Sequence, residues 1–452
     1  MSNYRIQITS LSTSEVNHIS SNLKTGELRS TCESLFDPEG KNLHGISRYP
    51  WRPVIIIFCI GLILKSTVYW EPHFEVDEFI YIALVQQLDS GRGYTLQGHP
   101  IVEEGALDPI QYNRPVFFHP PGGPGLFWMF HRMFGDSGYP LVQIFSFILF
   151  YASLMLMGQT LGCGENKWSI IVLALLGAFN PIMSHVVTNY WLDGPLLAFC
   201  TLSVALFLMS IVRGPIWIAL IAGMILGYAS LIKVTAFLVV PGALLLAMLA
   251  KRSKDSESLV KPMLYFLVVA VLIQLPWEFY LWITYGNAFP EWAGKPSASL
   301  VASNSYVHFL TVIRTPWTYL SLVPRILWTL VPGLILWILL WPHPRIRKLG
   351  MALLIWIAIV LTFHMILGAL GYSKVVRYVI LLVPAAIVLF TTTFGQALRL
   401  AHRGDLLPGG RIIAWFVLAI CILALAMEIT TGITCSFRTK HDLIMPFFGP
   451  QL

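Results

Sequence analysis

The dominant pattern along the chain is a series of apolar runs, each about long enough to cross a bilayer and separated from the next by a short polar segment. A transmembrane α-helix needs about 20 mostly apolar residues. Such runs begin near Val54 and recur almost to the C-terminus. The pattern predicts an all-α polytopic membrane protein with about eleven transmembrane helices. The predicted spans are residues 53–70, 139–161, 168–187, 192–212, 215–232, 234–250, 262–285, 319–341, 350–370, 378–398 and 412–434.

One long polar segment, residues 71–138, interrupts this pattern after the first predicted span. It is rich in charge, Gly and Pro, and we expect it to form a first outer loop that carries two short interfacial helices. The first follows Asp77 over residues 79–88, and the second covers 126–134. Between them, residues 119–124 contain three prolines and two glycines, so we expect a rigid turn that is neither helix nor strand.

Basic residues lie in short clusters between the apolar runs, as expected if they mark cytoplasmic loops. With the N-terminus inside, the clusters at 251–254 and 345–348 both fall on the cytoplasmic side, and a slip of one span would separate them. This orientation places 71–138 outside the cytoplasm. Residues 1–50 are polar, without the apolar core of a signal peptide, so we expect a disordered cytoplasmic tail ahead of a membrane domain at 51–452.

Composition excludes other classes of protein. Hydrophobic residues make up 56% of the 452 positions and charged residues only 12%, about half the share typical of soluble domains. The net charge of +7 is divided among loops and forms no single basic patch, so nucleic-acid binding is not expected. Six scattered cysteines with no CxxC spacing predict neither a disulfide framework nor a zinc site.

The outer loop supplies the first candidates for chemistry. Asp77 and Glu78 are adjacent at the predicted start of a helix, where side chains point about 100° apart, so one carboxylate can face a cavity while the other binds backbone or a neighbour. The first role is that of a general base for an acceptor hydroxyl, and the alternative is a helix cap beside a solvated acid. His119 either orients a carboxylate, touches a phosphate, or belongs only to the rigid turn.

The predicted topology brings further polar residues to the same side of the membrane. Asp193 stands at the outer end of the fourth span, where it can cap the helix, face a water-filled cavity, or do both. Lys233, Lys374 and Arg377 could snorkel to the interface, or together form a cationic pocket for a lipid phosphate, next to Tyr378. Glu278 and Glu428 are possible counter-charges.

Several short motifs resemble those of the GT-C superfamily of membrane glycosyltransferases, above all protein O-mannosyltransferases and bacterial lipid A aminoarabinose transferases. The motifs are Asp77-Glu78 with Tyr81 and Ala83, His119-Pro120-Pro121-Gly122, Asn180-Pro181, Asp193-Gly194-Pro195-Leu196, Leu231-Ile232-Lys233, Arg377-Tyr378 and Pro384. Their order, spacing and sidedness fit from about residue 53 to about residue 384. Residues 51–452 are thus similar to a GT-C transmembrane catalytic domain.

This resemblance implies a polyprenyl-phosphate sugar as donor and an inverting transfer on the outer face of the membrane to a lipid, glycan or protein acceptor. It implies catalytic roles for Asp77 and Asp193, with Glu78 beside them, and donor-phosphate binding by Arg377 and Lys233. It implies no obligatory metal. We expect the membrane to be the bacterial inner membrane, or that of the ER if the protein is eukaryotic. No large C-terminal outer domain follows the last span, which disfavours the oligosaccharyltransferase branch and places a lipid A acceptor in doubt.

The alternative is a multi-pass lipid or solute transporter or flippase. Transporters often show internal repeats and binding groups near the middle of the membrane. This chain shows no repeat, and its polar residues collect at the outer edge, which favours the enzyme. An enzyme of this kind also requires Asp77 and Arg377 to share one cavity. A separation of more than roughly 20 Å would be far beyond the hydrogen-bond distance at which catalytic groups act.

Overall fold

The computed structural model describes residues 50–66, 76–105, 107, 112–163, 166–250, 257–287, 319, 323–324, 327–369, 376–403 and 408–437. These residues form helices and connecting turns, and no strand occurs among them. The helices of the outer loop are α3 (Val76–Asp89), α4 (Pro100–Glu103), α6 (Gly122–Phe134) and η2 (Gly135–Ser137). The apolar helices are α2 (Trp51–Ser66), α7 (Gly138–Thr160), α8 (Lys167–Phe179), α9 (Pro181–Val187), α10 (Asp193–Arg213), α11 (Ile216–Ile232), η4 (Val234–Val239), α12 (Val240–Ala250), α13 (Glu257–Tyr285), α16 (Leu330–Leu339), α17 (Pro344–Ala369), η5 (Val376–Leu382), α18 (Val383–Arg403) and α19 (Pro408–Phe437).

The helical content confirms an all-α integral membrane protein. Seven helical segments of the described chain are long and apolar enough to cross a membrane, and three apolar helices of 10–17 residues accompany them. Each of the predicted spans overlaps at least one of the observed helices. The count of eleven crossings stays a prediction, because α11, α12 and α16 are shorter than a typical span. The N-terminal tail, residues 1–49, lies outside the described residues.

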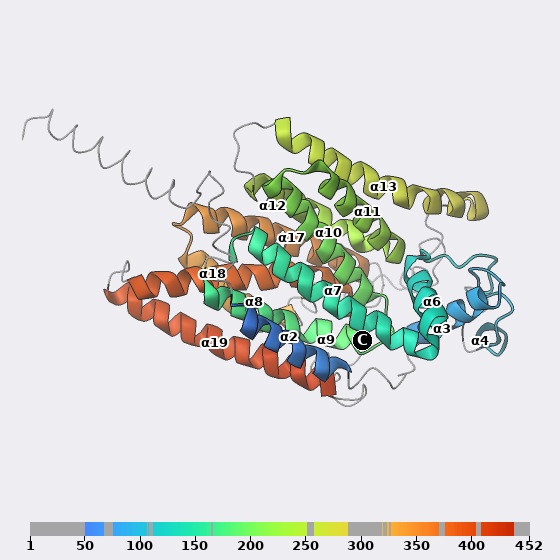
Figure 1. The fold of residues 1–452 in the computed structure, drawn as a ribbon, viewed down its shortest axis with the longest axis horizontal. Helices are drawn as coiled ribbons and strands as arrows, with labels where there is room; N and C mark the ends of the chain where they lie inside the picture. The colour runs from blue at the N-terminus through green and yellow to red at the C-terminus, as the bar shows by residue number, and fades with distance from the viewer. Residues whose placement is uncertain are drawn as a thin grey trace, which may run out of the picture. The chain divides into compact units, whose positions relative to one another are not determined.

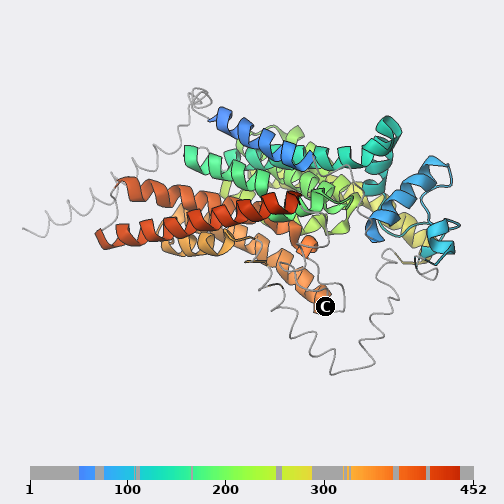
Figure 2. The ribbon, with the colours of Figure 1, turned by 90° about the horizontal axis from the view of Figure 1, so that it is seen from below.

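The long helices run side by side, from α13 at the top of Figure 1 to α19 at the bottom. The helices of the outer loop, α3, α4 and α6, lie together at one end of the bundle in both Figure 1 and Figure 2, with one end of α13 beside them. In the apolar part of α18, 89% of residues are buried, against 17% in α13. The first therefore belongs to the interior, and the second presents most of its surface to lipid.

Small residues bring α11 and α13 close together. Gly223 and Gly227 lie four residues apart on one face of α11, and a Cβ at Gly223 would stand 2.6 Å from the carbonyl oxygen of Phe266. Such spacing of small residues allows membrane helices to approach at backbone distance. The buried ring of Phe266 stacks on Phe207 of α10, with ring centroids 4.3 Å apart, so α13 is fixed against α10 as well.

Asn180, followed by Pro181, interrupts the third predicted span. It ends α8 and caps α9, where its Oδ1 accepts a hydrogen bond from the Met183 amide and Pro181 is the first helical residue. Its Nδ2 donates to Glu428 of α19, which also accepts from the amide and hydroxyl of Thr329. The buried Glu428 therefore satisfies the polar groups at a helix break inside the bundle.

The outer loop departs from the prediction at its second helix. We expected residues 119–124 to be non-helical, but α6 begins at Gly122, because Pro is tolerated in the first turn of a helix and Pro124 stands there. Gly122 is required by close packing, since a Cβ would lie 2.7 Å from the backbone of Leu231, and its carbonyl accepts from the Tyr228 hydroxyl. The start of α6 is thereby fixed to the end of α11.

We predict that Gly122→Ala destabilises the protein by about 1–3 kcal/mol, because a methyl group would overpack the contact with the backbone of Leu231. The matched control is Gly125→Ala, one turn further along α6, where nothing lies within 4 Å of the added Cβ. Unfolding monitored by circular dichroism in detergent measures both variants. Equal stability of the two would contradict the close contact.

Candidate active site

The ends of four helical elements bring two acids and two bases into one cluster, which we call the charge cluster: Asp77, Asp193, Lys233 and Arg377. The Nη2 atom of Arg377 donates to Oδ2 of Asp77. Lys233 Nζ lies 2.8 Å from Asp193 Oδ1, and Arg377 Nε lies 4.0 Å from Asp193 Oδ2. Asp77 and Arg377 are thus in direct contact although 300 residues separate them in the chain.

Burial differs strongly among the four side chains. The exposed fraction is 3% for Asp193, 10% for Arg377, 19% for Lys233 and 35% for Asp77. Buried charges need partners of opposite sign, and each of the three less exposed side chains of the charge cluster has such a partner. Asp77 is the member of the charge cluster that solvent reaches most readily.

The local backbone favours these charges where they stand. Asp193 and Asp77 lie in the first turns of α10 and α3, where the helix dipole stabilises a negative charge. Lys233 follows the last residue of α11, has extended dihedral angles and donates its amide to the Ala229 carbonyl. A positive charge is favoured at that end of a helix. Helix polarity therefore contributes to placing acids opposite bases.

Two aromatic rings form walls of the charge cluster. The guanidinium carbon of Arg377 lies 4.3 Å from the ring centre of Trp191, and the Tyr378 ring lies 5.5 Å from Lys233 Nζ. Both distances are within the range of cation–π attraction, which orients a guanidinium group over a ring face. Trp191 was not among the residues we predicted for the site.

The neighbours of Asp77 set its ionisation. Burial alone would raise the pKa of its carboxyl, but the charges of Arg377 and Lys233, the hydrogen bond from Arg377 and the nearby His119 act in the opposite direction, and the net shift is downward. For Tyr81, one turn further along α3, burial and the nearby Asp77 carboxylate raise the pKa well above its usual value. At neutral pH the site therefore holds an ionised Asp77 beside a neutral phenol.

Glu78, the other half of the acidic pair, points to a different partner. Its side chain is 1% exposed, and Oε1 accepts a hydrogen bond of 2.8 Å from the Tyr190 amide. It thus takes the second of the two predicted orientations, toward backbone. Tyr190 stacks on Tyr139 of α7, and Gln143 of α7 donates to the carbonyl of Trp191, so α3 and α7 together hold the turn ahead of Asp193.

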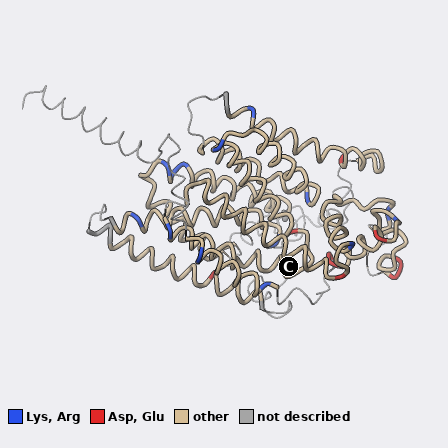
Figure 3. The backbone as a smooth tube through the Cα atoms, viewed as in Figure 1, with Lys and Arg blue, Asp and Glu red and all other residues tan. Residues whose placement is uncertain are grey.

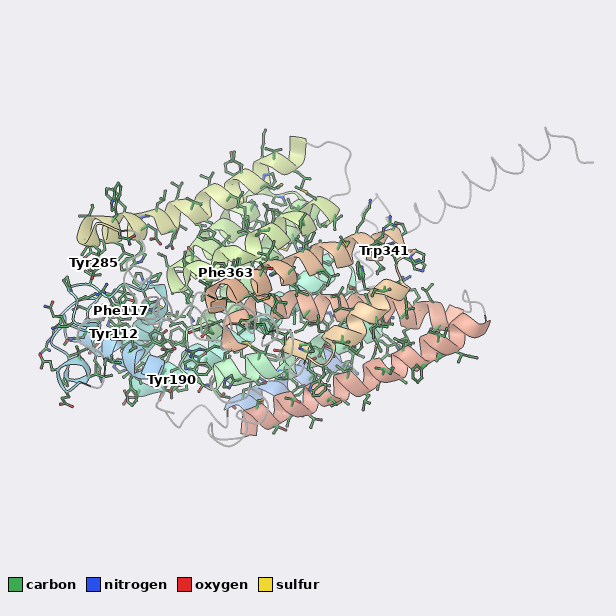
Figure 4. The ribbon with its side chains drawn as sticks, turned by 180° about the vertical axis from the view of Figure 1, so that it is seen from behind. Tyr112, Phe117, Tyr190, Tyr285, Trp341 and Phe363 are labelled. Carbon is green, nitrogen blue, oxygen red and sulfur yellow. The ribbon has the colours of Figure 1, made fainter. Side chains whose placement is uncertain are left out.

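His119 lies at the edge of the site. Its ring packs against Phe117 and Phe118, and its backbone carbonyl accepts from the Tyr94 hydroxyl. It is near enough to Asp77 to influence the pKa of that carboxyl. Figure 4 shows Phe117 and Tyr112 in the loop beside the end of α13 that carries Tyr285, whose hydroxyl accepts from the Val116 amide.

The other predicted residues have mixed outcomes. Tyr378 lies beside Lys233 and Arg377, as expected. Lys374 lies outside the described residues. Glu428 is not a counter-charge of the cluster, since it binds Asn180 and Thr329, and Glu278 accepts from Gln274 on its own helix. The chemical roles of the site residues stay predictions.

One residue near the charge cluster has no counterpart in the sequence predictions. His364 of α17 is 3% exposed and stacks on Tyr378, with ring centroids 6.1 Å apart. It lies within electrostatic range of Lys233 and Asp193. A histidine inside a long apolar run is itself a signal of function in a membrane protein, and that signal could have found it.

The charge cluster does not suit a divalent metal ion. Such ions bind several oxygen ligands that are not already compensated by cations. Both carboxylates of the charge cluster face Arg377 or Lys233, and no group of three or more His, Cys, Asp and Glu side chains in the described part of the chain is arranged to hold a metal. We derive no step through a metal.

Comparison with known proteins gives a family match over part of the chain and a shared fold. The family profile described as dolichyl-phosphate-mannose-protein mannosyltransferase matches residues 118–282, which contain Asp193 and Lys233 but neither Asp77 nor Arg377. No curated protein matches the chain.

Solved structures of the oligosaccharyltransferase of Archaeoglobus fulgidus share the fold. The crystal structure of its complex with Zn and sulfate has a TM-score of 0.55 and 14% identity, and the alignment covers 85% of this chain and 53% of that one. The complex of AglB with an inhibitory peptide and a dolichol-phosphate has a TM-score of 0.52 and 14% identity, and the alignment covers 85% of this chain and 56% of that one. This chain spans about half the length of those proteins. The resemblance to the GT-C superfamily is thereby confirmed at the level of fold.

The lowered pKa of Asp77 predicts a pH-dependent contribution to stability. Because the carboxyl releases its proton more readily in the folded protein than in the unfolded chain, where its pKa is near 3.8, ionised Asp77 stabilises the fold above that pH. This contribution is lost as the pH falls through the lower, folded value. The difference in unfolding free energy between the wild type and Asp77→Asn should therefore be constant above about pH 5 and shift against the wild type below pH 4.

Urea unfolding in detergent between pH 2.5 and 7 measures that difference. The control is Asp136→Asn, which makes the same substitution at a side chain that is 98% exposed. A wild-type-minus-Asp77→Asn difference that does not vary with pH would contradict the downward shift.

Proposed function

We propose that this protein transfers a sugar from a polyprenyl-phosphate donor to an acceptor hydroxyl on a lipid, glycan or protein, with inversion, and that Asp77 is the base. The observation that carries the proposal is the charge cluster, in which an ionised acid and two cations from separate helices meet at the edge of the membrane domain. Transfer of a sugar to a hydroxyl requires an ionised acid to take the proton of the hydroxyl and cations to bind the phosphate of the donor.

Arg377 is suited to hold the donor phosphate. Its Nη2 atom binds Asp77, whereas Nε and Nη1 are buried and have no hydrogen-bond partner among the described residues. Buried donors without partners are costly, and a phosphate oxygen satisfies them with charge-assisted hydrogen bonds. A donor phosphate that binds the Arg377 guanidinium competes with the Asp77 carboxylate for that group. Donor binding therefore releases Asp77 for catalysis.

The reaction is a single displacement. The Asp77 carboxylate accepts the proton of the acceptor hydroxyl while the acceptor oxygen forms a bond to the anomeric carbon of the sugar. The bond from that carbon to the phosphate oxygen breaks, and its electron pair leaves with the polyprenyl phosphate. Arg377 and Lys233 stabilise the negative charge of the departing phosphate. Attack from the face opposite the leaving group inverts the anomeric configuration.

The two acids take different parts in this proposal. Asp77 is the more exposed and can meet an acceptor, whereas Asp193 is 3% exposed and binds Lys233 at 2.8 Å. Asp193 therefore acts as a positioning residue that orients both cations. Glu78 holds the turn that carries Trp191, through the Tyr190 amide.

The distribution of charge supports an outer location for the site. Figure 3 shows acidic residues gathered at the end of the helices near α3 and α4, and several basic residues at the opposite end. Arg213 ends α10, Lys167 begins α8, and Arg345 lies in the first turn of α17. The positive-inside rule assigns that end to the cytoplasm, so we propose that the charge cluster faces the periplasm or the ER lumen.

The transporter alternative expects binding groups at broken helices near the middle of the membrane. The four charges stand instead at helix ends, Asp77 in the outer loop and the other three at the ends of apolar helices, which favours the glycosyltransferase.

We predict that Asp77→Asn lowers the rate of sugar transfer by about 10²–10⁴-fold, because it removes the base. The variant should bind polyprenyl phosphate at least as tightly as the wild type, because Arg377 loses its competing carboxylate. The purified chain in detergent would receive a panel of polyprenyl-phosphate sugars, with released polyprenyl phosphate as the readout. Asp136→Asn serves as the matched control and should keep wild-type turnover. Full turnover in Asp77→Asn would remove Asp77 as the base.

A further inference from the structure

His364 is a buried polar side chain whose hydrogen-bonding capacity is unused. It lies near the C-terminal end of α17, directly after Phe363, which is labelled in Figure 4 and contacts its ring edge-on. Only 3% of the residue is exposed, and neither ring nitrogen has a hydrogen-bond partner among the described residues. Leaving a buried donor or acceptor without a partner costs free energy, so the great majority of such groups in proteins are satisfied.

The surroundings of His364 indicate what satisfies it. Its ring stacks on Tyr378 at an interplanar angle of 19°, and the same tyrosine lies 5.5 Å from Lys233 Nζ and 5.4 Å from the guanidinium carbon of Arg377. His364 is also in electrostatic range of Lys233 and Asp193. The unsatisfied histidine thus adjoins the two cations that we assign to the donor phosphate.

Arg377 shows the same property in the same place. Its Nε and Nη1 atoms are buried and unsatisfied among the described residues, and it is the residue that precedes Tyr378. Two side chains from different helices, α17 and η5, therefore present unused hydrogen-bonding groups next to the same tyrosine ring. A single ligand with several acceptor oxygens would satisfy both, and a phosphate monoester or diester is such a ligand.

We infer that His364 binds the donor, donating a ring N–H to a phosphoryl oxygen of the polyprenyl phosphate that Arg377 and Lys233 also hold. The inference rests on the proposed function and extends its phosphate site to a residue of α17. A neutral imidazole has one N–H donor, which is enough for this bond. The ring of Tyr378 fixes the plane of the imidazole and hence the direction of the bond.

The experiment compares His364→Phe and His364→Gln with the wild type, in the full chain purified in detergent. Phenylalanine fills the same space and keeps the stacking on Tyr378 but has no nitrogen, whereas glutamine keeps an N–H donor. The probe is undecaprenyl phosphate, and undecaprenol, which lacks the phosphate, reports contacts of the lipid chain alone. His402→Phe is the matched control. His402 lies near the C-terminal end of α18, and its ring also packs on an aromatic ring, that of Trp415 in α19.

We expect His364→Phe to weaken binding of undecaprenyl phosphate by about 10-fold or more, the loss typical of one hydrogen bond to a charged group. His364→Gln should recover part of that loss, and binding of undecaprenol should not change in either variant. The thermal midpoint without lipid should not fall in His364→Phe, because an unsatisfied polar group is removed. His402→Phe should bind as the wild type does.

Two outcomes would overturn the inference, and they differ from each other. If His364→Phe binds undecaprenyl phosphate as tightly as the wild type while Arg377→Ala does not bind it, His364 only fills space and the proposed function stands. If the wild type binds undecaprenyl phosphate no better than undecaprenol, the phosphate site itself fails, and the proposed function fails with it.

Discussion

The contact on which the rest of the site depends is the ion pair of Arg377 with Asp77. A guanidinium group that is 10% exposed at the edge of a membrane domain requires compensating charge, and the two carboxylates of the charge cluster provide it. This requirement ties η5 to α3 and α10, elements that are distant in the sequence. In the absence of donor the Asp77 carboxylate neutralises Arg377. The same carboxylate must leave Arg377 before it can act as the base that we propose.

The outer loop is held so that this contact can form. Gly122 packs on the backbone of Leu231, two residues before Lys233, and Glu78 binds the backbone of Tyr190, three residues before Asp193. Each of these contacts joins the loop to the chain just ahead of a charged residue of the site. The loop is therefore part of the active-site framework, and small shifts of α3 or α6 would move the charges themselves.

The sequence allowed the charge cluster to be predicted because helix ends are readable. Apolar runs of membrane length assign Asp193, Lys233 and Arg377 to the ends of different spans and Asp77 to the outer loop, and alternation of inside and outside places all four on one side of the membrane. His364 was missed although a histidine inside an apolar run is a signal of function, because the run does not show which face of the helix points to the site. The prediction also misplaced the start of α6, since prolines at 120–124 mark a turn and a first helical turn equally well.

The most direct test is a structure of the protein with bound undecaprenyl phosphate. The account predicts that the phosphate lies within hydrogen-bond distance of the Arg377 guanidinium, and that the Asp77 carboxylate has left Arg377 and faces the open side of the site. A phosphate bound elsewhere, with the pair of Arg377 and Asp77 intact, would contradict the central claim that this pair is the donor site in its empty form.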